Sequence, residues 1–480
     1  MPSEIELKLE LSLEAVKQLL SSDILGEPNS VLMQTSTYFD TADRTLFEHG
    51  FTLRIRRTGE ARMQTVKATG ESASLFARSE WETPVQEDTP VLDHTSPLQS
   101  EFGTDLEVAP LFVVEIARRV WNIDESGSTI EVALDQGKVV SGERATSICE
   151  AEIELKDGDR DSLFIFARKL EAVAPFRFGA RSKAERGFSL IEAQQNAYKA
   201  EPLHLDRNMR TISAFQTIVA SCFRHFRLNE DILLLRRNAE ALHQARVAIR
   251  RLRSAFSLFK PLLRGNEPQR LKDEFRWLAG VLGEARNLDV LMTKATDRDL
   301  RAKLKDAREA VYDDAVMALG SSRARALMLD FNEWLECGDY HARVVPGNAP
   351  AHDFAAKALG KMRRKLKKHG RDLAEVDDEE RHQARKDAKK LRYAAEFFGS
   401  LFDNKRGVRR HKRFIASMEE LQDHLGDLND LATGPRVLSQ HGLSNHPARD
   451  TVISRANKGA LIDKAQASLD DVLDAKRFWR

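Results

Sequence analysis

The sequence predicts an α+β protein of two domains, a closed antiparallel β-barrel followed by an all-helical bundle with an internal duplication. Three observations predict this fold. Short runs in the first 200 residues alternate charged and apolar side chains, as strands with one polar face do. Later in the chain, long amphipathic stretches rich in Ala, Leu, Arg, Lys and Glu indicate helices. One of these stretches recurs 139 residues further on.

The first alternating run begins at the fourth residue. In an extended strand Glu4, Glu6 and Lys8 point to one side, and the intervening Ile and Leu residues point to the other. Further runs of this kind lie at 51–56, 64–67, 80–82, 130–135 and 150–155. An open sheet rarely carries so many charges on one face, because like charges on neighbouring strands repel. We therefore expect a closed barrel with a polar interior, which suits a polyanion and hard divalent cations.

Several motifs follow one another in this half of the chain. They are Glu4-x-Glu6-x-Lys8, Tyr38-Phe39-Asp40-Thr41, Leu53-Arg54-Ile55-Arg56, Arg118-x-x-Trp121, Ile130-Glu131-Val132-Ala133-Leu134-Asp135, Glu150-x-Glu152-x-Glu154-Leu155 and Ser182-Lys183. Their order resembles the CYTH superfamily, the triphosphate tunnel metalloenzymes, over residues 1–200. The resemblance implies an eight-stranded antiparallel tunnel that hydrolyses triphosphate-containing substrates with Mg²⁺ or Mn²⁺. Some members instead cyclise ATP or hydrolyse thiamine triphosphate.

The resemblance also implies roles for the charged residues of the tunnel. The cations that would hold phosphate oxygens are Lys8, Arg54, Arg56, Lys67, Arg118 and Lys183. The metal ligands would be Glu4, Glu6, Glu152 and Glu154. Either Glu131 or Asp135 would assist the attacking water, and the sequence does not choose between them. A shift of one residue in strand register would put Arg119 in the place of Arg118.

Composition limits the class of protein. No apolar run approaches the length of a membrane span, and the N-terminus lacks the basic and apolar segments of a secretion signal. The three cysteines form no CxxC pair, which argues against a zinc or disulfide framework and predicts a cytoplasmic protein. Residues 1–200 hold 22 Lys and Arg against 34 Asp and Glu, and the remaining residues hold 53 against 40. The basic half should attract a polyanion, unless the two halves neutralise each other by docking.

The second half, from residue 206 to 476, is a duplicated helical unit. Segment 243–256 aligns without gaps on 382–395, and seven of the fourteen positions are identical. Downstream, Leu278-x-x-x-Leu282-Gly283-Glu284 returns as Leu421-x-x-x-Leu425-Gly426-Asp427. We expect the two repeats, at about 206–345 and 350–476, to pack around a pseudo-two-fold axis.

Both copies of the repeated helix carry a stripe of cations. One stripe is His243, Arg246, Arg250 and Arg253, and the other is His382, Arg385, Lys389 and Arg392. Such a face is solvated, paired with acids of a neighbouring helix, or wrapped around an anion, because unpaired buried cations are costly. Retention of the stripe in both copies favours the anion. Asp387 replaces Ala248 in the second copy, where we expect it to weaken the positive field or to pair with a nearby cation.

The paired His-x-x-Arg helices resemble the CHAD domain, a module often fused to CYTH domains, and the resemblance implies binding of inorganic polyphosphate. The order of the two domains resembles bacterial inorganic triphosphatases, which implies hydrolysis of inorganic triphosphate to diphosphate and phosphate. Two alternatives stay open: a non-catalytic polyphosphate-binding protein, and a tunnel that cyclises ATP or processes another nucleoside or thiamine triphosphate. Aromatic residues are sparse among the cations, which argues against nucleic acid as a partner. The sequence predicts no membrane partner and identifies no protein partner.

Overall fold

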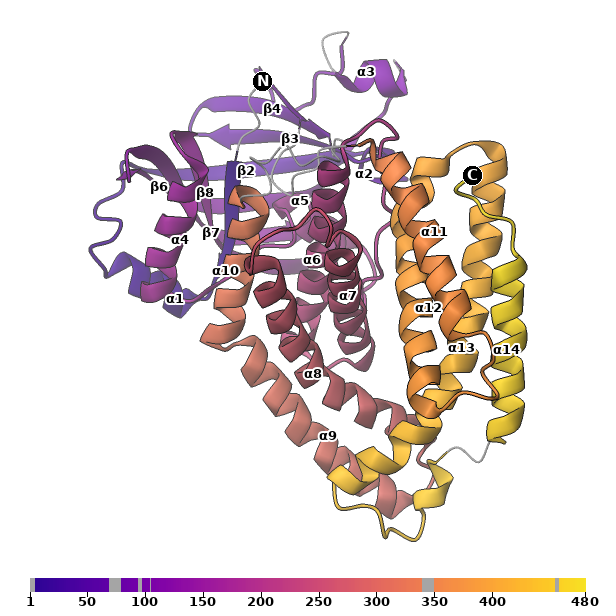
Figure 1. The fold of residues 1–480 in the computed structure, drawn as a ribbon. Helices are drawn as coiled ribbons and strands as arrows, with labels where there is room; N and C mark the ends of the chain where they lie inside the picture. The colour runs from indigo at the N-terminus through magenta and orange to yellow at the C-terminus, as the bar shows by residue number, and fades with distance from the viewer. Residues whose placement is uncertain (1–4, 69–78, 94–96, 104, 339–348, 454–456) are drawn as a thin grey trace. The chain divides into compact units, whose positions relative to one another are not determined.

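A computed structural model describes residues 5–68, 79–93, 97–103, 105–338, 349–453 and 457–480 (Figure 1). The chain forms two compact units. Unit 1 consists of residues 1–195 together with 328–338, and unit 2 consists of 196–327 and 339–480. Among the described residues, none of the helices is both long and apolar enough for a membrane span.

Unit 1 is built on one antiparallel sheet of nine strands. The strands are β1 (Ile5–Leu11), β2 (Ser30–Asp40), β3 (Phe51–Thr58), β4 (Ala61–Ala68), β5 (Ser79–Pro84), β6 (Ala109–Glu125), β7 (Ser128–Ser141), β8 (Arg144–Asp157) and β9 (Phe176–Phe178). Their order across the sheet is β5-β4-β3-β2-β6-β7-β8-β1-β9. The helices of this unit are α1 (Leu13–Leu20), α2 (Thr45–Glu48), α3 (Pro97–Phe102), α4 (Arg160–Val173) and α5 (Lys183–Ile191).

The prediction of a closed eight-stranded barrel is wrong. The sheet has nine strands and ends at β5 and β9, which do not pair with each other in the part of the chain that the structure describes. Repulsion between like charges does not force closure, because acids and bases from neighbouring strands face each other. Lys8 lies opposite Glu152, and Arg118 lies opposite Asp135. An open sheet therefore carries this charged face by neutralising it locally.

Helix α5 covers part of the same face of the sheet. Its apolar residues Ala184 and Phe188 join a buried cluster with Phe112 and Val114 of β6. Gly187 permits this close approach, because a Cβ atom there would lie 2.1 Å from the ring of Phe112. The helix is thereby fixed with its first residues above the charged part of the sheet.

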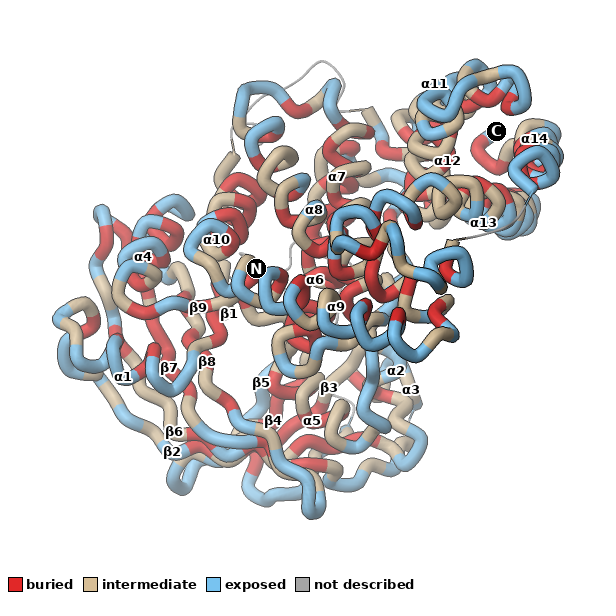
Figure 2. Tube along the Cα trace, turned by 90° about the horizontal axis from the view of Figure 1, so that it is seen from below, coloured by how far each residue is buried: buried red, intermediate tan, exposed pale blue. Residues whose placement is uncertain are grey.

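Unit 2 is helical, as the sequence predicts. Its helices are α6 (Thr211–Leu235), α7 (Ala239–Leu258), α8 (Glu267–Lys294), α9 (Arg298–Leu319), α11 (Ala351–His369), α12 (Asp378–Phe398), α13 (Lys405–Gln440) and α14 (Lys458–Asp474), with short 3₁₀ turns at Gly399–Phe402 and Arg449–Thr451. Helix α10 (Ser322–Cys337) begins in unit 2, and its later residues belong to unit 1. Buried residues are concentrated along α6 (Figure 2).

The duplicated segments fall on equivalent helices. Segment 243–256 lies in α7 and 382–395 in α12, while the two Leu-Gly motifs lie in α8 and α13. Equivalent helices of the two repeats contact each other, α6 with α11, α7 with α12 and α8 with α13. Contacts between like elements are what a two-fold relation between repeats requires. The cationic stripes on α7 and α12 are thereby brought together.

Candidate functional site

Strand register places most of the predicted tunnel residues on one face of the sheet, called here the ionic face. Cross-strand pairing aligns Lys8 with Glu152, Ala133 with Glu152, and Arg118 with Asp135. Because side chains alternate along a strand, this register places ten of the predicted residues on the ionic face. They are Glu6, Lys8, Arg54, Arg56, Lys67, Arg118, Glu131, Asp135, Glu152 and Glu154.

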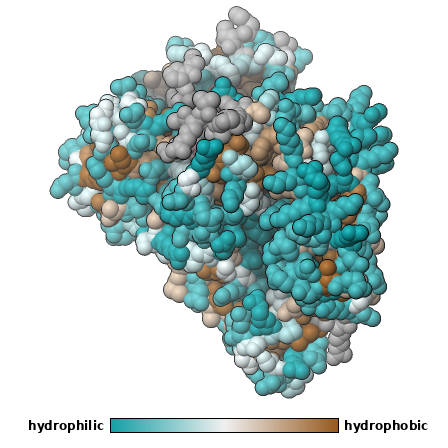
Figure 3. All heavy atoms as spheres, viewed as in Figure 1, coloured by the Kyte–Doolittle hydropathy of each residue, from teal (hydrophilic) through white to brown (hydrophobic). Residues whose placement is uncertain are grey.

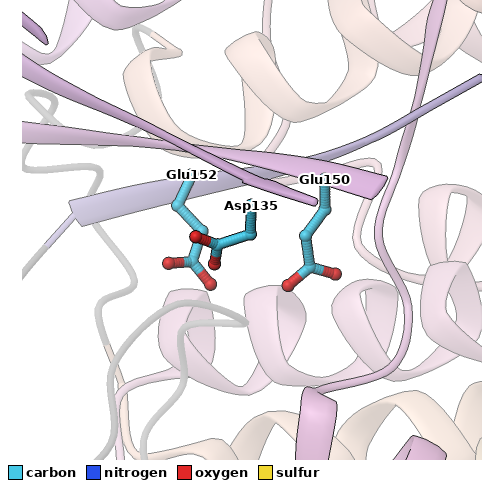
Figure 4. A group of neighbouring side chains, drawn as sticks. All are labelled: Asp135, Glu150 and Glu152. Carbon is cyan, nitrogen blue, oxygen red and sulfur yellow. The ribbon is translucent and has the colours of Figure 1, made fainter. Parts of the chain in front are cut away.

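The centre of the ionic face is a cluster of three carboxylates. Asp135, Glu150 and Glu152 point to the same side of the sheet, and their ligand atoms lie within 4.8 Å of one another (Figure 4). The ammonium of Lys183 lies 2.7 Å from Asp135, 2.6 Å from Glu150 and 2.9 Å from Glu152. Arg118 donates to both oxygens of Asp135 and to Glu152. The cluster is therefore a network of mutually compensating charges.

Helix capping positions Lys183 in this network. Ser182 caps α5 by accepting a hydrogen bond from the backbone N–H of Glu185, whose carboxylate accepts one from the backbone N–H of Ser182. Lys183 is the first residue of the helix and follows this cap directly. Arg186 lies one turn later and pairs with Glu10 and, at 3.7 Å, with Glu150. The start of α5 thus supplies two cations to the ionic face.

The network shifts the pKa values of its members in opposite directions. Burial raises the pKa of Glu152, but Lys183, Lys8 and Arg118 outweigh burial and hold the pKa well below its usual range. Burial lowers the pKa of Lys183, but Glu150, Glu152 and Asp135 raise it above its usual value. At neutral pH Glu152 is therefore ionised and Lys183 is charged.

Arginines dominate the β3 side of the ionic face. Arg54 donates a 3.4 Å hydrogen bond to the hydroxyl of Tyr38, and its guanidinium lies 3.6 Å from Glu80. Lys67 pairs with the same Glu80 at 2.7 Å. Arg56 has no ion-pair partner among the described residues. Burial, Arg54 and Arg118 lower its pKa to about 10. This side of the face has an excess of positive charge that a phosphate group would relieve.

The other side of the ionic face suits a divalent cation. Burial and Glu152 raise the pKa of Glu6, which has no ion-pair partner in the described part of the chain. Carboxylate oxygens are the ligands that Mg²⁺ and Mn²⁺ prefer. A metal ion near Glu6 and Glu152 would relieve their repulsion. A metal ion within the three-carboxylate cluster would have to replace the ammonium of Lys183. The carboxylates thus fit a hard divalent cation.

The remaining predicted residues are placed as follows. Glu4 lies outside the described residues. Glu131 and Glu154 share the ammonium of Lys156, at 3.3 Å and 2.8 Å. Arg119 donates to Gln136 and lies on the opposite face from Arg118, which settles the register that the sequence left open.

Sequence reasoning omitted two residues of the network from the site. Glu150 is fully buried in the three-carboxylate cluster. Its place in the alternating run with Glu152 and Glu154 was the signal that could have identified it. Arg186 follows Lys183 by three residues, so helical spacing could have identified it as a second cation on the same face of α5.

Unit 2 contains a pocket of about 790 Å³, called here the basic pocket. Helices α7, α8, α12 and α13 line it. Six of the eight cationic-stripe residues predicted from the sequence contribute to the lining, namely His243, Arg246, Arg250, Arg385, Lys389 and Arg392. Arg253 and His382 are not among the lining residues. Both repeats therefore contribute cations to one cavity.

The cations of the basic pocket are mostly uncompensated. Arg246, Arg385 and Lys389 form no ion pair with the described residues. Burial and neighbouring cations lower the pKa of Arg246 to about 10 and that of Lys389 to about 7. Burial and four cations, Arg286 foremost, lower the pKa of His243 to about 4 and keep it neutral. Arg392 differs, because it pairs with Glu396 and Glu419.

Two further residues explain how this pocket is built. Gly283 leaves room for Arg246, because a Cβ atom there would lie 2.3 Å from the guanidinium. Arg286, one turn along α8, lines the pocket and was missed by sequence reasoning, since its counterpart in the second repeat is Asn429. Asp387 lies outside the pocket lining. Its carboxylate lies 3.4 Å from the ammonium of Lys365 and 2.6 Å from the ring of His369, so it pairs with basic side chains of α11.

Comparisons with known proteins agree with this division of the chain. Residues 2–188 match the CYTH domain family, and residues 217–439 match the CHAD domain family. An inorganic triphosphatase from Haemophilus influenzae is 35% identical over 203 residues, which cover 40% of this chain. The match spans 56% of the length of that relative.

Two solved structures are similar to parts of the chain. The CHAD domain from the plant Ricinus communis is 28% identical, with a TM-score of 0.49, and the match covers 57% of this chain and 96% of that one. The putative adenylyl cyclase HpAC1 from Hippeastrum, described as having a dominant triphosphatase activity, is 22% identical, with a TM-score of 0.32, over 39% of this chain and 95% of that one. The family matches show that the chain combines a CYTH domain, which carries the ionic face, with a CHAD domain, which carries most of the basic pocket.

Proposed function

We propose that the protein hydrolyses inorganic triphosphate to diphosphate and phosphate on the ionic face, with Mg²⁺ or Mn²⁺. One observation supports this most strongly: a single face joins a group of carboxylates to arginines, one of which, Arg56, has no ion-pair partner among the described residues. Hydrolysis of a phosphoanhydride needs positioning and charge neutralisation more than covalent help. The name of the Haemophilus relative gives the same reaction.

The residues of the ionic face divide this work between them. Arg54, Arg56 and Arg118 would hold phosphate oxygens, with Lys8, Lys67 and Lys183 as further contacts. Glu6, Glu152 and Glu154, with Glu4, would hold the divalent cation, which when bound neutralises phosphate charge and polarises the scissile bond. Asp135 already accepts both hydrogen bonds of the Arg118 fork, so it orients that arginine. Glu131 is the better placed of the two acids to accept a proton from water, since among the described residues it pairs only with the partly exposed Lys156.

The test is phosphate release by the full chain from inorganic triphosphate, ATP and thiamine triphosphate, with Mg²⁺, Mn²⁺ or EDTA. We expect metal-dependent release that is fastest from inorganic triphosphate. Arg56→Ala should lower kcat/KM by about a hundredfold, as removal of one preorganised donor does. Arg57→Ala is the matched control, because Arg57 is the next residue of β3 and points to the other face.

Two results would contradict the proposal. Absence of release from all three substrates would leave a non-catalytic role, and equal losses in the Arg56 and Arg57 variants would mean that the ionic face is not the site. Formation of cyclic AMP from ATP in place of phosphate release would favour the cyclase alternative.

We further propose that the basic pocket binds inorganic polyphosphate. The support is a cavity that both repeats line with cations, of which Arg246, Arg385 and Lys389 form no ion pair with the described residues, so an anion would relieve repulsion that the fold leaves in place. Titration calorimetry with polyphosphate, in EDTA to stop turnover, tests this. No heat of binding at low salt would overturn it.

A further inference from the structure

A second cavity of about 700 Å³ lies in unit 2, and we call it the arginine pocket. It is lined by Arg406, Arg409, Arg410, Arg413 and Ser417 of α13, and by Asp471, Ala475 and Lys476 at the end of α14. Five cations thus face one carboxylate. Among the described residues, none of these five cations forms an ion pair. The pocket has a strong excess of positive charge.

The arginine pocket is separate from the basic pocket. Arg406, Arg409, Arg410 and Arg413 follow helical spacing and form one stripe on α13. The α13 residues that line the basic pocket begin at Gln422 and, at 100° per residue, lie largely on the opposite side of the helix. The partner elements differ as well, since α14 lines the arginine pocket and α7, α8 and α12 line the basic pocket.

The far wall of the arginine pocket is held in place. Phe478 and Trp479 are buried, and both rings pack against Phe414 of α13. Arg410 donates a 3.2 Å hydrogen bond to the carbonyl of Arg477. The chain after α14 is therefore anchored at Arg477 and at the two residues that follow it, which holds the backbone of Lys476 beside the arginines. Arg406, Arg409, Arg413 and Lys476 are exposed, so a ligand can reach them.

Most of the stripe is particular to the second repeat. With the offset of 143 residues between the two Leu-Gly motifs, the counterparts of Arg406, Arg409 and Arg410 are Leu263, Asn266 and Glu267, whereas that of Arg413 is Arg270. Three of the four arginines are therefore not a remnant of the duplicated unit. Figure 3 shows that the visible surface over α11 to α14 is mostly hydrophilic, with a few small hydrophobic spots, which does not suit an apolar partner.

We propose that the arginine pocket is a second binding site for a chain of phosphate groups. Guanidinium groups match phosphate oxygens in a two-pronged geometry. The four arginines extend over roughly 10 Å of helix, at 1.5 Å per residue, so they suit a linear ligand with several charges. Nucleic acid is a poorer fit, because the aromatic rings beside the pocket are buried and cannot stack on bases. The inference extends the proposed function of the CHAD domain and rests on it for polyphosphate as the ligand.

The experiment compares two paired substitutions in the full chain. Arg409→Ala with Arg413→Ala removes two pocket cations, and Lys405→Ala with Lys412→Ala removes two cations from the same helical turns but outside the lining. Each pair is made in the wild type and in an Arg246→Ala, Arg385→Ala background, which disables the basic pocket. Calorimetry with short-chain linear polyphosphate in EDTA gives affinity and stoichiometry. Far-UV circular dichroism checks that each variant is folded.

We expect the background variant to retain a binding event that weakens about tenfold or more when the arginine pair is removed, because charge-assisted hydrogen bonds are lost. The lysine pair should weaken it less than threefold. Equal effects of the two pairs would overturn the inference, since a solvated cationic surface explains them.

Separate outcomes distinguish the two proposals. Complete loss of binding in the background variant overturns the arginine pocket and leaves the proposed basic pocket standing. Unchanged binding in the background variant, with loss in the arginine pair, supports the arginine pocket and contradicts the basic pocket. Displacement of polyphosphate by single-stranded DNA or by anionic phospholipid vesicles at lower charge concentration would overturn the ligand class.

Discussion

The ionic face and the basic pocket both contain cations, yet the surroundings of a lysine ammonium have opposite effects on its pKa in the two places. On the ionic face Lys183 contacts three carboxylates, and its pKa is raised. In the basic pocket Lys389 lacks an ion-pair partner among the described residues, and its pKa is lowered to about 7. A phosphate group that binds to Lys183 must compete with partners already present. One that binds to Lys389 relieves repulsion.

This difference separates stability from binding. The paired charges of the ionic face, such as Lys183, contribute to folding because their partners are in place before any ligand arrives. The unpaired charges of the basic pocket, such as Lys389, oppose folding and favour binding. Substitutions in the two regions should therefore have opposite effects on the free energy of unfolding, and this expectation orders the predictions that follow.

The largest effect is expected from Lys183→Met. It leaves Asp135, Glu150 and Glu152 without their central cation, and breaking a buried ion pair costs about 3–5 kcal/mol. Urea unfolding followed by circular dichroism measures the loss, and phosphate release should fall below detection.

Adding Glu150→Gln to this variant provides the control. Removing one of the uncompensated charges should restore part of the lost stability but none of the activity. If Lys183→Met leaves the urea midpoint unchanged, the network does not stabilise unit 1 and the comparison fails.

The second effect is expected in the basic pocket, from Arg246→Met. The free energy of unfolding should stay equal or rise, because the fold does not compensate this charge. Affinity for polyphosphate should fall about tenfold, since one charge-assisted hydrogen bond is worth roughly 1.5–3 kcal/mol.

Arg253→Met is the matched control, as Arg253 belongs to the same predicted stripe but does not line the pocket. Calorimetry and urea unfolding of both variants check the prediction. A similar loss of affinity in the control would show that the net charge of the unit, and not the pocket, governs binding.

These contrasts also show what the sequence could predict. Apolar side chains that recur every two positions identify strands in unit 1, and those that recur every 3.6 positions identify helices in unit 2. The duplication indicates that α7 and α12 are equivalent. Alternation alone places Glu6, Lys8, Glu152 and Glu154 on a common face, as their register in the structure does. Local patterns of this kind are readable because they depend on residues a few positions apart.

The sequence did not reveal in the same way whether the sheet closes into a barrel or which charges neutralise each other. Both depend on which strands become neighbours, which alternation does not encode. The prediction of a barrel treated the charges of unit 1 as repelling, whereas Arg118 and Lys183 lie directly among the acids. The arginines of α13 were overlooked for a similar reason, because their pocket needs the end of α14 as its second wall.

The third prediction concerns pH. Lys389 in the free protein loses its proton near pH 7, because burial and then Arg385, Arg250 and Arg246 disfavour the charged form. Bound polyphosphate favours that form, so binding takes up a proton above this pH. Affinity should therefore fall as pH rises from about 7 to about 9, and Lys389→Met should flatten the dependence. Calorimetry in buffers of different ionisation enthalpy measures the proton uptake directly.

The lowered pKa of Lys389 also determines whether its contribution to the free energy of unfolding rises or falls with pH. The folded pKa of Lys389 lies below its ordinary value of 10.5, so the unfolded chain binds more protons between about pH 7 and that value. This residue should make the ligand-free protein more stable as pH rises through that window, and Lys389→Met should remove the contribution. A pH-independent difference between wild type and variant would contradict the assigned environment.

The smallest effect on stability is expected from Lys156→Met, at the edge of the ionic face. Its side chain is 41% exposed and bridges Glu131 and Glu154, so its loss should change the free energy of unfolding by no more than about 1 kcal/mol. Without this ammonium, Glu154 is free to serve a divalent cation beside Glu6. The metal concentration that gives half-maximal phosphate release should therefore fall, whereas Lys138→Met, which removes a similarly exposed lysine paired with Glu115, should leave it unchanged. A higher metal requirement in the Lys156 variant would mean that Glu154 is not a metal ligand and that the lysine itself contacts the substrate.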